Sequence, residues 1–233
     1  MDSIQERYDI KTAAAWILGH SRTSGIPELS AGLKDKTADD CTDEELLEIF
    51  TAGQSACLKL YPFKNGTQTL ARTRRVMGFL RSIPFETMLD VGSGRGVFLI
   101  PFMKDFPWVQ VTSLDLLEKR VAFLNELADG GFRQLHAEQK DICNQPFPDE
   151  SFDVVSLLEV LEHIPEVDKA VKAAVMMARQ YVVVTVPSKP DDNPEHIHLL
   201  TKEKLTQLFN AAGCTKLHFD GVEGHLFLVA AKE

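Results

Sequence analysis

Apolar-rich runs alternate with amphipathic stretches over the last two thirds of the chain. The runs at 88–91, 109–114, 152–158 and 181–186 have the length and composition of buried parallel strands. Between them, apolar residues recur at helical spacing over 97–104, 118–128 and 167–178. This alternation predicts an α/β fold with a Rossmann-like, doubly wound sheet, whose ligands bind beyond the carboxyl ends of its strands.

The C-terminal segments depart from that alternation. A predicted helix at 205–212, with Thr201 as its N-cap, is followed by strand-like runs at 215–220 and 225–231. Only residues 221–224 separate those two runs, and so short a connection cannot hold a crossover helix. The pattern therefore predicts an antiparallel C-terminal hairpin on an otherwise parallel sheet.

The segment before residue 85 has a helical pattern. Thr42 and Glu45 have the spacing of a capping box at the start of a helix. A second helical run at 70–80 is ended by Pro84. We expect a helical N-terminal extension over residues 1–84 and an α/β domain over residues 85–233.

Composition narrows the class of protein. The 233 residues are 44% hydrophobic and 25% charged, which is typical of a packed domain and argues against a disordered chain. The apolar run at 13–18 is too short for a signal peptide or a membrane span. Four scattered cysteines without a C-x-x-C pair suit a reducing compartment, so we expect a cytoplasmic protein with no membrane partner.

Charge is distributed unevenly along the chain. There are 25 Lys and Arg against 34 Asp and Glu, and the net charge of −9 argues against a surface that coats nucleic acid. The stretch 59–81 nevertheless holds six basic residues and no acidic one. That stretch is either a solvated helix face or a surface that recognises an anion.

A glycine-rich turn follows the first predicted strand. Asp90, Gly92, Gly94 and Gly96 lie between that strand and a helix, where glycines let the backbone turn sharply and approach a ligand. Asp115 ends the next strand, where a carboxylate can accept both hydroxyls of a ribose. The two features together predict a ligand of the adenosine type.

In order and spacing, the glycine turn, Asp115, the pair Asp141 and Ile142, and the strand at 151–155 resemble the class I S-adenosylmethionine-dependent methyltransferases. The resemblance implies a seven-stranded sheet whose last strand is antiparallel, with S-adenosylmethionine as the cofactor. It implies that the glycines approach the methionine part, that Asp115 binds the ribose, and that Asp141 and Ile142 frame the adenine. The implied cofactor-binding residues are Asp90, Gly92, Gly94, Gly96, Asp115, Leu116, Asp141, Ile142 and Glu159.

The fourth predicted strand is followed by candidate catalytic residues. Glu159, Glu162 and His163 have i, i+3 and i+4 spacing, so on a helical turn all three would face one point. Such a set suits a divalent metal ion, with His196 or His198 as a further ligand; we take Glu159, Glu162, His163 and His198 as the candidate metal set. In the alternative interpretation, Glu162 and His163 shape the cofactor pocket and no metal binds.

This cluster is similar to that of metal-dependent O-methyltransferases acting on the 3′-terminal ribose of small RNAs, and to the Glu-x-x-Glu-His of ubiquinone-biosynthesis O-methyltransferases. We therefore expect a methyltransferase acting on a small molecule, at oxygen. One alternative is a metal-dependent RNA ribose 2′-O-methyltransferase, and another is a catalytically silent, cofactor-binding partner subunit.

Overall fold

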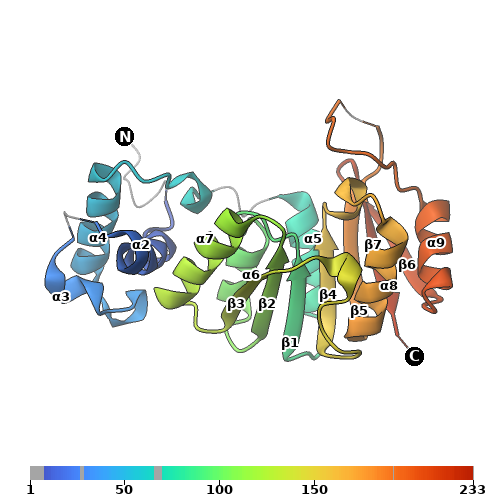
Figure 1. Ribbon diagram of the computed structural model, residues 1–233, viewed down its shortest axis with the longest axis horizontal. Coiled ribbons are helices and arrows are strands. Elements are labelled where there is room, and N and C mark those ends of the chain that lie inside the picture. The colour runs from blue at the N-terminus through green and yellow to red at the C-terminus, as the bar shows by residue number, and fades with distance from the viewer. Residues whose placement is uncertain (1–7, 27–28, 66–69, 191, 233) are drawn as a thin grey trace. The chain divides into compact units, whose positions relative to one another are not determined.

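The computed structural model describes residues 8–26, 29–65, 70–190 and 192–232. Seven strands form one sheet in the order β3-β2-β1-β4-β5-β7-β6 (Figure 1). The strands are β1 Thr87–Val91, β2 Gln110–Asp115, β3 Leu135–Gln139, β4 Phe152–Leu158, β5 Ala178–Pro187, β6 Lys216–Val222 and β7 His225–Ala231. The α-helices are α2 Ile10–Ser24, α3 Ala31–Lys34, α4 Asp43–Ser55, α5 Ala71–Leu80, α6 Leu99–Asp105, α7 Glu118–Asp129, α8 Val167–Met177 and α9 Lys202–Ala211.

The strand directions confirm the predicted fold class. β1 pairs in parallel with both β2 and β4, and β4 pairs in parallel with β5. β7 runs antiparallel to both β5 and β6, as the short connection between the last two strands predicts. The sheet is therefore mixed, and its parallel strands bring their carboxyl ends to one edge.

One strand, β3, has no counterpart among the strand-like runs of the sequence. It lies at an edge of the sheet and contributes only two buried apolar side chains, Leu135 and Ala137. The Asn125 side chain, on α7, donates to the carbonyl of Ala137 (3.0 Å) and accepts from its N–H (2.9 Å). Pairing with β2 and this side chain satisfy backbone groups of β3, which forms without a strong apolar pattern of its own.

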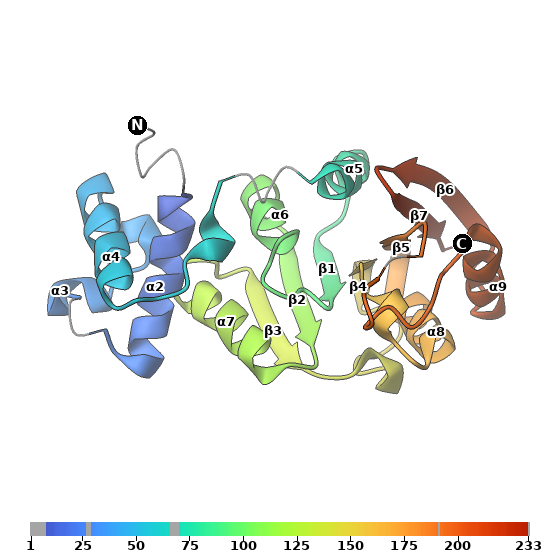
Figure 2. The ribbon, with the colours of Figure 1, turned by 90° about the horizontal axis from the view of Figure 1, so that it is seen from above.

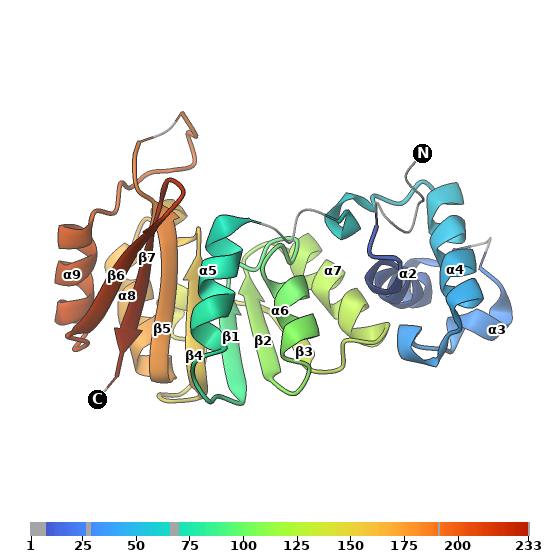
Figure 3. The ribbon, with the colours of Figure 1, turned by 180° about the vertical axis from the view of Figure 1, so that it is seen from behind.

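The contacts divide the chain into two compact units that are interleaved in sequence. One comprises residues 1–68, 94–107 and 117–137, and the other comprises residues 69–93, 108–116 and 138–233. In the second unit, α5 and α8 cover opposite faces of the sheet, as seen from above and from behind (Figures 2 and 3). A core of apolar side chains from β4, β5 and α8, including Val155, Val182 and Val171, fills one of these faces.

In the first unit, α2 and α7 pack closely because two glycines lie at their contact. A Cβ on Gly19 would come within 1.8 Å of the carbonyl oxygen of Glu126, and a Cβ on Gly130 within 1.6 Å of that of Ala15. Backbone of one helix thus lies directly against the other. Any larger residue at either position would force the two helices apart.

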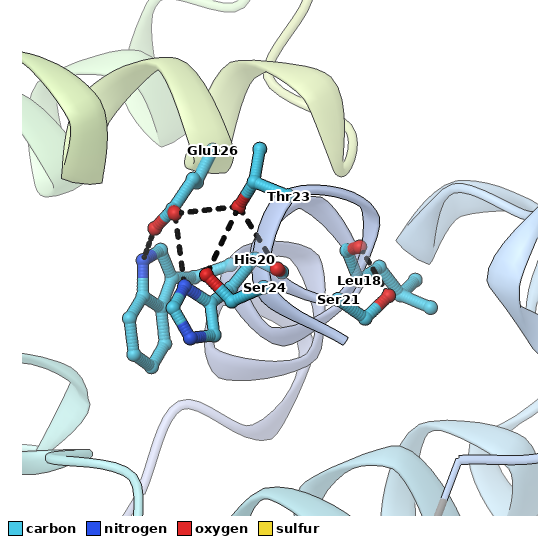
Figure 4. A network of polar contacts seen from close by, with 7 residues as sticks. Leu18, His20, Ser21, Thr23, Ser24 and Glu126 are labelled. Atoms are coloured by element: carbon cyan, nitrogen blue, oxygen red, sulfur yellow. Dashed lines mark hydrogen bonds and ion pairs between the residues drawn. The ribbon is translucent and has the colours of Figure 1, made fainter. Parts of the chain in front are cut away.

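Polar contacts join the same two helices (Figure 4). The Glu126 carboxylate, on α7, accepts hydrogen bonds from Trp16 Nε1 (2.9 Å) and Thr23 Oγ1 (3.1 Å). His20 Nδ1 lies 2.9 Å from Oε1, the same oxygen that Thr23 contacts, and its ring stacks on Trp16. One carboxylate thereby ties three side chains of α2 to α7.

The helix ends follow their predicted signals. Thr42 caps α4: its hydroxyl accepts from the N–H of Glu45, and the Glu45 carboxylate accepts from the N–H of Thr42. The Thr201 hydroxyl accepts from the N–H of Lys204 at the start of α9.

None of the helices in the described part of the chain is long and apolar enough to cross a membrane. The boundary between residues 84 and 85 stays a prediction about which segments fold on their own.

Candidate functional site

The glycine-rich turn after β1 has the backbone conformation that its sequence predicts. Gly92, Gly94 and Gly96 have φ angles of 69°, 60° and 74°, in the left-handed region that favours glycine. A Cβ on Gly92 would lie 2.6 Å from a methyl carbon of Val160. Glycine is therefore required both by the turn and by the space beside it.

Asp90 is a buried carboxylate next to this turn. It is only 3% exposed, and its Oδ1 accepts a hydrogen bond of 2.5 Å from Ser156 Oγ on β4. Burial raises the pKa of Asp90 to about 6, against the hydrogen bonds from Ser156 and Ser93, which lower it. A positive group bound nearby would stabilise the charged form of this carboxylate.

Asp115 is the last residue of β2, the strand next to β1. Its side chain is buried, whereas the following Leu116 is 62% exposed. The side-chain amide of Gln139 donates to the carbonyl of Leu116 (2.9 Å), which fixes the backbone just beyond the strand. The sheet thus places Asp90 and Asp115 on neighbouring strands at the same edge, as the sequence pattern predicts.

Asp141 and Ile142 follow β3 and begin a short 3₁₀ turn, Ile142–Asn144. The Asp141 carboxylate accepts from the N–H of Cys143 (2.9 Å) and so caps that turn. Ile142 is 4% exposed and packs in the apolar core under α8. The role of this pair around an adenine stays a prediction.

Glu159 is not part of the helical turn that its spacing predicts. The 3₁₀ turn contains only Leu161–His163, and Glu159 precedes it with a φ of 59°. Its Oε2 lies 2.9 Å from Nε2 of His225, the first residue of β7. The left-handed backbone of Glu159 turns its side chain toward β7, so the three residues do not face a single point.

A different set of three residues lies close together: two that follow β4 and one that follows β5. One potential ligand atom from each of Glu162, His163 and His196 lies within 4.8 Å of the others. His163 Nδ1 lies 2.9 Å from the carbonyl oxygen of Glu195, an arrangement in which Nδ1 donates and Nε2 keeps its lone pair. His198 is directed elsewhere, with its Nε2 3.0 Å from the carbonyl oxygen of Ile164.

The basic stretch is partly used by the fold. Arg75, on α5, donates to the Asp220 carboxylate of β6 (2.9 Å) and lies over the ring of Phe227 on β7. This arginine helps to hold α5 on the C-terminal hairpin. Recognition of an anion by the other basic residues of the stretch stays a prediction.

Two polar residues at this edge of the sheet carry no signal in the sequence. His225 contacts Glu159 although it lies 66 positions farther along the chain. Thr185, on β5, is fully buried, and its hydroxyl has no hydrogen-bond partner among the described residues. Neither residue belongs to a recognisable motif, because only the pairing of the strands brings them to this edge.

Known proteins are similar to part of this sequence. Residues 89–181 match the family described as "Methyltransferase domain". The ribosomal RNA small subunit methyltransferase G of Leuconostoc mesenteroides is 37% identical over 72 residues, which is 29% of this chain and 30% of that protein. The ubiquinone biosynthesis O-methyltransferase of Paramagnetospirillum magneticum is 38% identical over 94 residues, covering 36% of this chain and 33% of that one.

A third relative is the 27-O-demethylrifamycin SV methyltransferase of Amycolatopsis mediterranei. It is 34% identical over 114 residues, covering 48% of this chain and 41% of that protein. The chain thus spans less than half the length of each of these curated relatives.

Solved structures share the fold. A methyltransferase from Aquifex aeolicus superimposes with a TM-score of 0.57 at 20% identity, over 70% of this chain and 89% of that one. Magnesium protoporphyrin IX methyltransferase from Synechocystis superimposes with a TM-score of 0.58 at 16% identity, over 70% of this chain and 82% of that one. Residues 89–181 thus match a methyltransferase family, and the chain shares the fold of these two methyltransferases.

Proposed function

We propose that this protein is an S-adenosylmethionine-dependent methyltransferase that methylates a small molecule at oxygen. The observation that carries the proposal is the glycine turn after β1, with a buried carboxylate at the end of each of two neighbouring strands. The three glycines of the turn carry no side chains, which allows the close backbone approach that such a cofactor needs.

Each residue of the proposed cofactor site has a role. Asp115 accepts the ribose hydroxyls, with Leu116 as an apolar neighbour, and Asp141 and Ile142 frame the base. The glycine turn, beside Asp90, receives the methionine part. The bound cofactor supplies a methyl group on a sulfonium, so the protein contributes alignment of the acceptor and exclusion of water.

The proposal that the acceptor is a small molecule with an oxygen nucleophile rests on two supports. The acidic net charge disfavours a broad nucleic-acid surface. Two of the relatives, the ubiquinone biosynthesis and the 27-O-demethylrifamycin SV enzymes, are named for such substrates. Other relatives are named for ribosomal RNA, so RNA is the competing class of acceptor.

Calorimetric titration with S-adenosylhomocysteine tests the cofactor site. We expect Asp115→Ala to weaken binding by about 1–3 kcal/mol, because the ribose hydroxyls lose their acceptor. Asp168→Ala, an exposed carboxylate in the first turn of α8, is the matched control and should bind like wild type. Equal affinity of wild type and Asp115→Ala would remove Asp115 from the site, and no binding by wild type would overturn the proposed function.

The second candidate function is metal-assisted transfer to an RNA ribose, and the cluster of Glu162, His163 and His196 favours it. One carboxylate and two imidazoles suit a divalent transition metal, and the contact of His163 Nδ1 with a carbonyl leaves Nε2 to coordinate. These three residues would hold the ion, which would lower the pKa of an acceptor hydroxyl.

Titration with Mn²⁺ distinguishes the metal site from a pocket wall. If the ion binds, His163→Ala and His196→Ala should each weaken Mn²⁺ binding at least about tenfold. His198→Ala is the control, because its Nε2 contacts a backbone carbonyl in the structure. If wild type and His163→Ala bind Mn²⁺ with equal affinity, the three residues do not form a metal site and only line the pocket.

A third interpretation is a catalytically silent partner subunit. It predicts tight binding of S-adenosylhomocysteine without methyl transfer to any acceptor, catechols and short RNAs included. Transfer of radiolabelled methyl to either class of acceptor by the purified chain would exclude it.

A further inference from the structure

Glu159 is held in a costly backbone conformation at the carboxyl end of β4. Its φ of 59° lies in the left-handed region, which a residue with a side chain adopts only when its surroundings compensate. The N–H of Glu159 donates to the carbonyl of Thr185 (2.9 Å), which ties this backbone to β5. Strain of this kind at the end of a central strand is typical of residues placed for a ligand.

The two oxygens of the Glu159 carboxylate have different surroundings. Oε2 is 2.9 Å from His225 Nε2, whereas Oε1 is buried and has no hydrogen-bond partner among the described residues. Buried polar atoms are rarely left without a partner, and a carboxylate oxygen is an especially costly case. The hydroxyl of Thr185, whose backbone carbonyl accepts from Glu159, is a second buried group with this property. Such oxygens are ready to accept a donor from a bound molecule.

The imidazole of His225 is fixed from both sides. Its Nδ1 lies 3.1 Å from the carbonyl oxygen of Glu223, in the turn between β6 and β7. That turn is joined to the end of β5, because the N–H of Ser188 donates to the carbonyl of Gly224 (2.9 Å). In the strand register, His225 lies opposite Pro187. The ring therefore approaches Glu159 from a turn whose backbone is hydrogen-bonded to the end of β5.

We propose that His225 is a positioning residue that holds the Glu159 carboxylate so that Oε1 accepts a hydrogen bond from the α-ammonium group of the bound cofactor. This inference rests on the proposed function. A carboxylate oxygen without a hydrogen-bond partner favours a cationic donor over a neutral one, because hydrogen bonds between charged groups are the stronger ones. The chemical class of the ligand is an amino acid with a free ammonium group, joined to the adenosyl part.

Calorimetry with two compounds tests the assignment. S-adenosylhomocysteine carries the α-ammonium group, whereas 5′-methylthioadenosine has the same adenosyl and thioether parts without it. We expect Glu159→Gln to weaken S-adenosylhomocysteine binding by about ten- to a hundredfold, the range for a lost hydrogen bond between charged groups. Binding of 5′-methylthioadenosine should be unchanged.

Two polar substitutions separate the roles of the two ring nitrogens. In His225→Gln the amide nitrogen takes the place of Nε2, so the donor to Glu159 is kept. In His225→Asn the amide reaches only the place of Nδ1, so the contact with Glu223 is kept and the one with Glu159 is lost. We expect His225→Asn to weaken S-adenosylhomocysteine binding at least about threefold and His225→Gln to restore it. His218→Asn, on the exposed side of β6, is the control.

Each result decides the proposal. Unchanged affinity of Glu159→Gln for S-adenosylhomocysteine would overturn the ammonium contact, and equal weakening in His225→Gln and His225→Asn would overturn the positioning role. Parallel weakening of both compounds would mean that these residues only maintain the shape of the pocket, which also overturns the proposal. If wild type binds neither compound, the proposed function fails, and that outcome is distinct from the others.

Discussion

At the residue scale, Asp153 shows how one buried carboxylate joins distant segments. Its Oδ2 accepts from the N–H groups of Glu86 (2.9 Å) and Thr87 (3.0 Å), and Arg179 donates to Oδ1. Burial alone would raise the pKa of Asp153, but the hydrogen bonds from Glu86, Arg179 and Thr87 outweigh it and lower the pKa to about 2. The charged carboxylate therefore links β1, β4 and β5 at the amino ends of these strands.

The lowered pKa sets the direction of a pH effect on stability. The contribution of Asp153 is fully present above its ordinary value of 3.8 and is lost as the pH falls toward 2. We expect Asp153→Asn to lower the free energy of unfolding by about 2 kcal/mol at pH 7, and the difference from wild type should shrink below pH 4. Urea titrations at pH 7 and pH 3 measure it, with Asp168→Asn as an exposed control. An equal loss at both pH values would contradict a charge effect.

At the element scale, the packing of α2 on α7 depends on glycine and not on apolar matching alone. Gly19 and Gly130 each lie where a Cβ would meet a carbonyl oxygen of the opposite helix. Glu126 adds hydrogen bonds from Trp16 and Thr23 across the same contact. Because backbone cannot move aside as a flexible side chain can, this contact tolerates little change in volume.

We expect Gly19→Ala and Gly130→Ala each to lower the free energy of unfolding by about 1–3 kcal/mol, as overpacking does. Gly78, on α5, is the matched control because no atom lies within 4 Å of the position of its Cβ. Gly78→Ala should leave stability unchanged or raise it by about 0.5–1 kcal/mol, since alanine favours a helix. Chemical denaturation of the three variants compares them, and a stable Gly130→Ala variant would contradict the close contact.

At the scale of the whole molecule, the two compact units are interleaved in sequence, so the chain passes between them several times. A ligand that binds only the folded chain stabilises it by mass action. At a hundred times its dissociation constant, S-adenosylhomocysteine should add about 2.7 kcal/mol. For a chain of this size, that corresponds to a rise in Tm of about 5–10 °C.

Differential scanning calorimetry with and without the compound measures this shift. Asp115→Ala should show a smaller rise at the same concentration, because its affinity is lower. A wild-type Tm that does not respond to saturating S-adenosylhomocysteine would contradict binding to the folded state.

Local patterns were sufficient for much of the fold. The strand runs, the capping box at Thr42 and Glu45, and the hairpin after α9 were predicted because each depends on residues close together in sequence. The same holds for the glycine turn, whose left-handed conformations favour glycine. β3 escaped prediction because only two of its five side chains are buried and apolar, so its sequence carries no strong apolar pattern.

The sequence by itself determined the α/β class, the direction of the hairpin, and the positions of Asp90 and Asp115 at neighbouring strand ends, since chain order and strand pattern settle these features. Only the tertiary structure decided which side chains meet after β4. Glu159 contacts His225, and it does not join Glu162 and His163 at one point. The histidine that lies close to Glu162 and His163 is His196, not His198. Spacing along a chain fixes contacts only within a regular helix, and here a left-handed residue interrupts it.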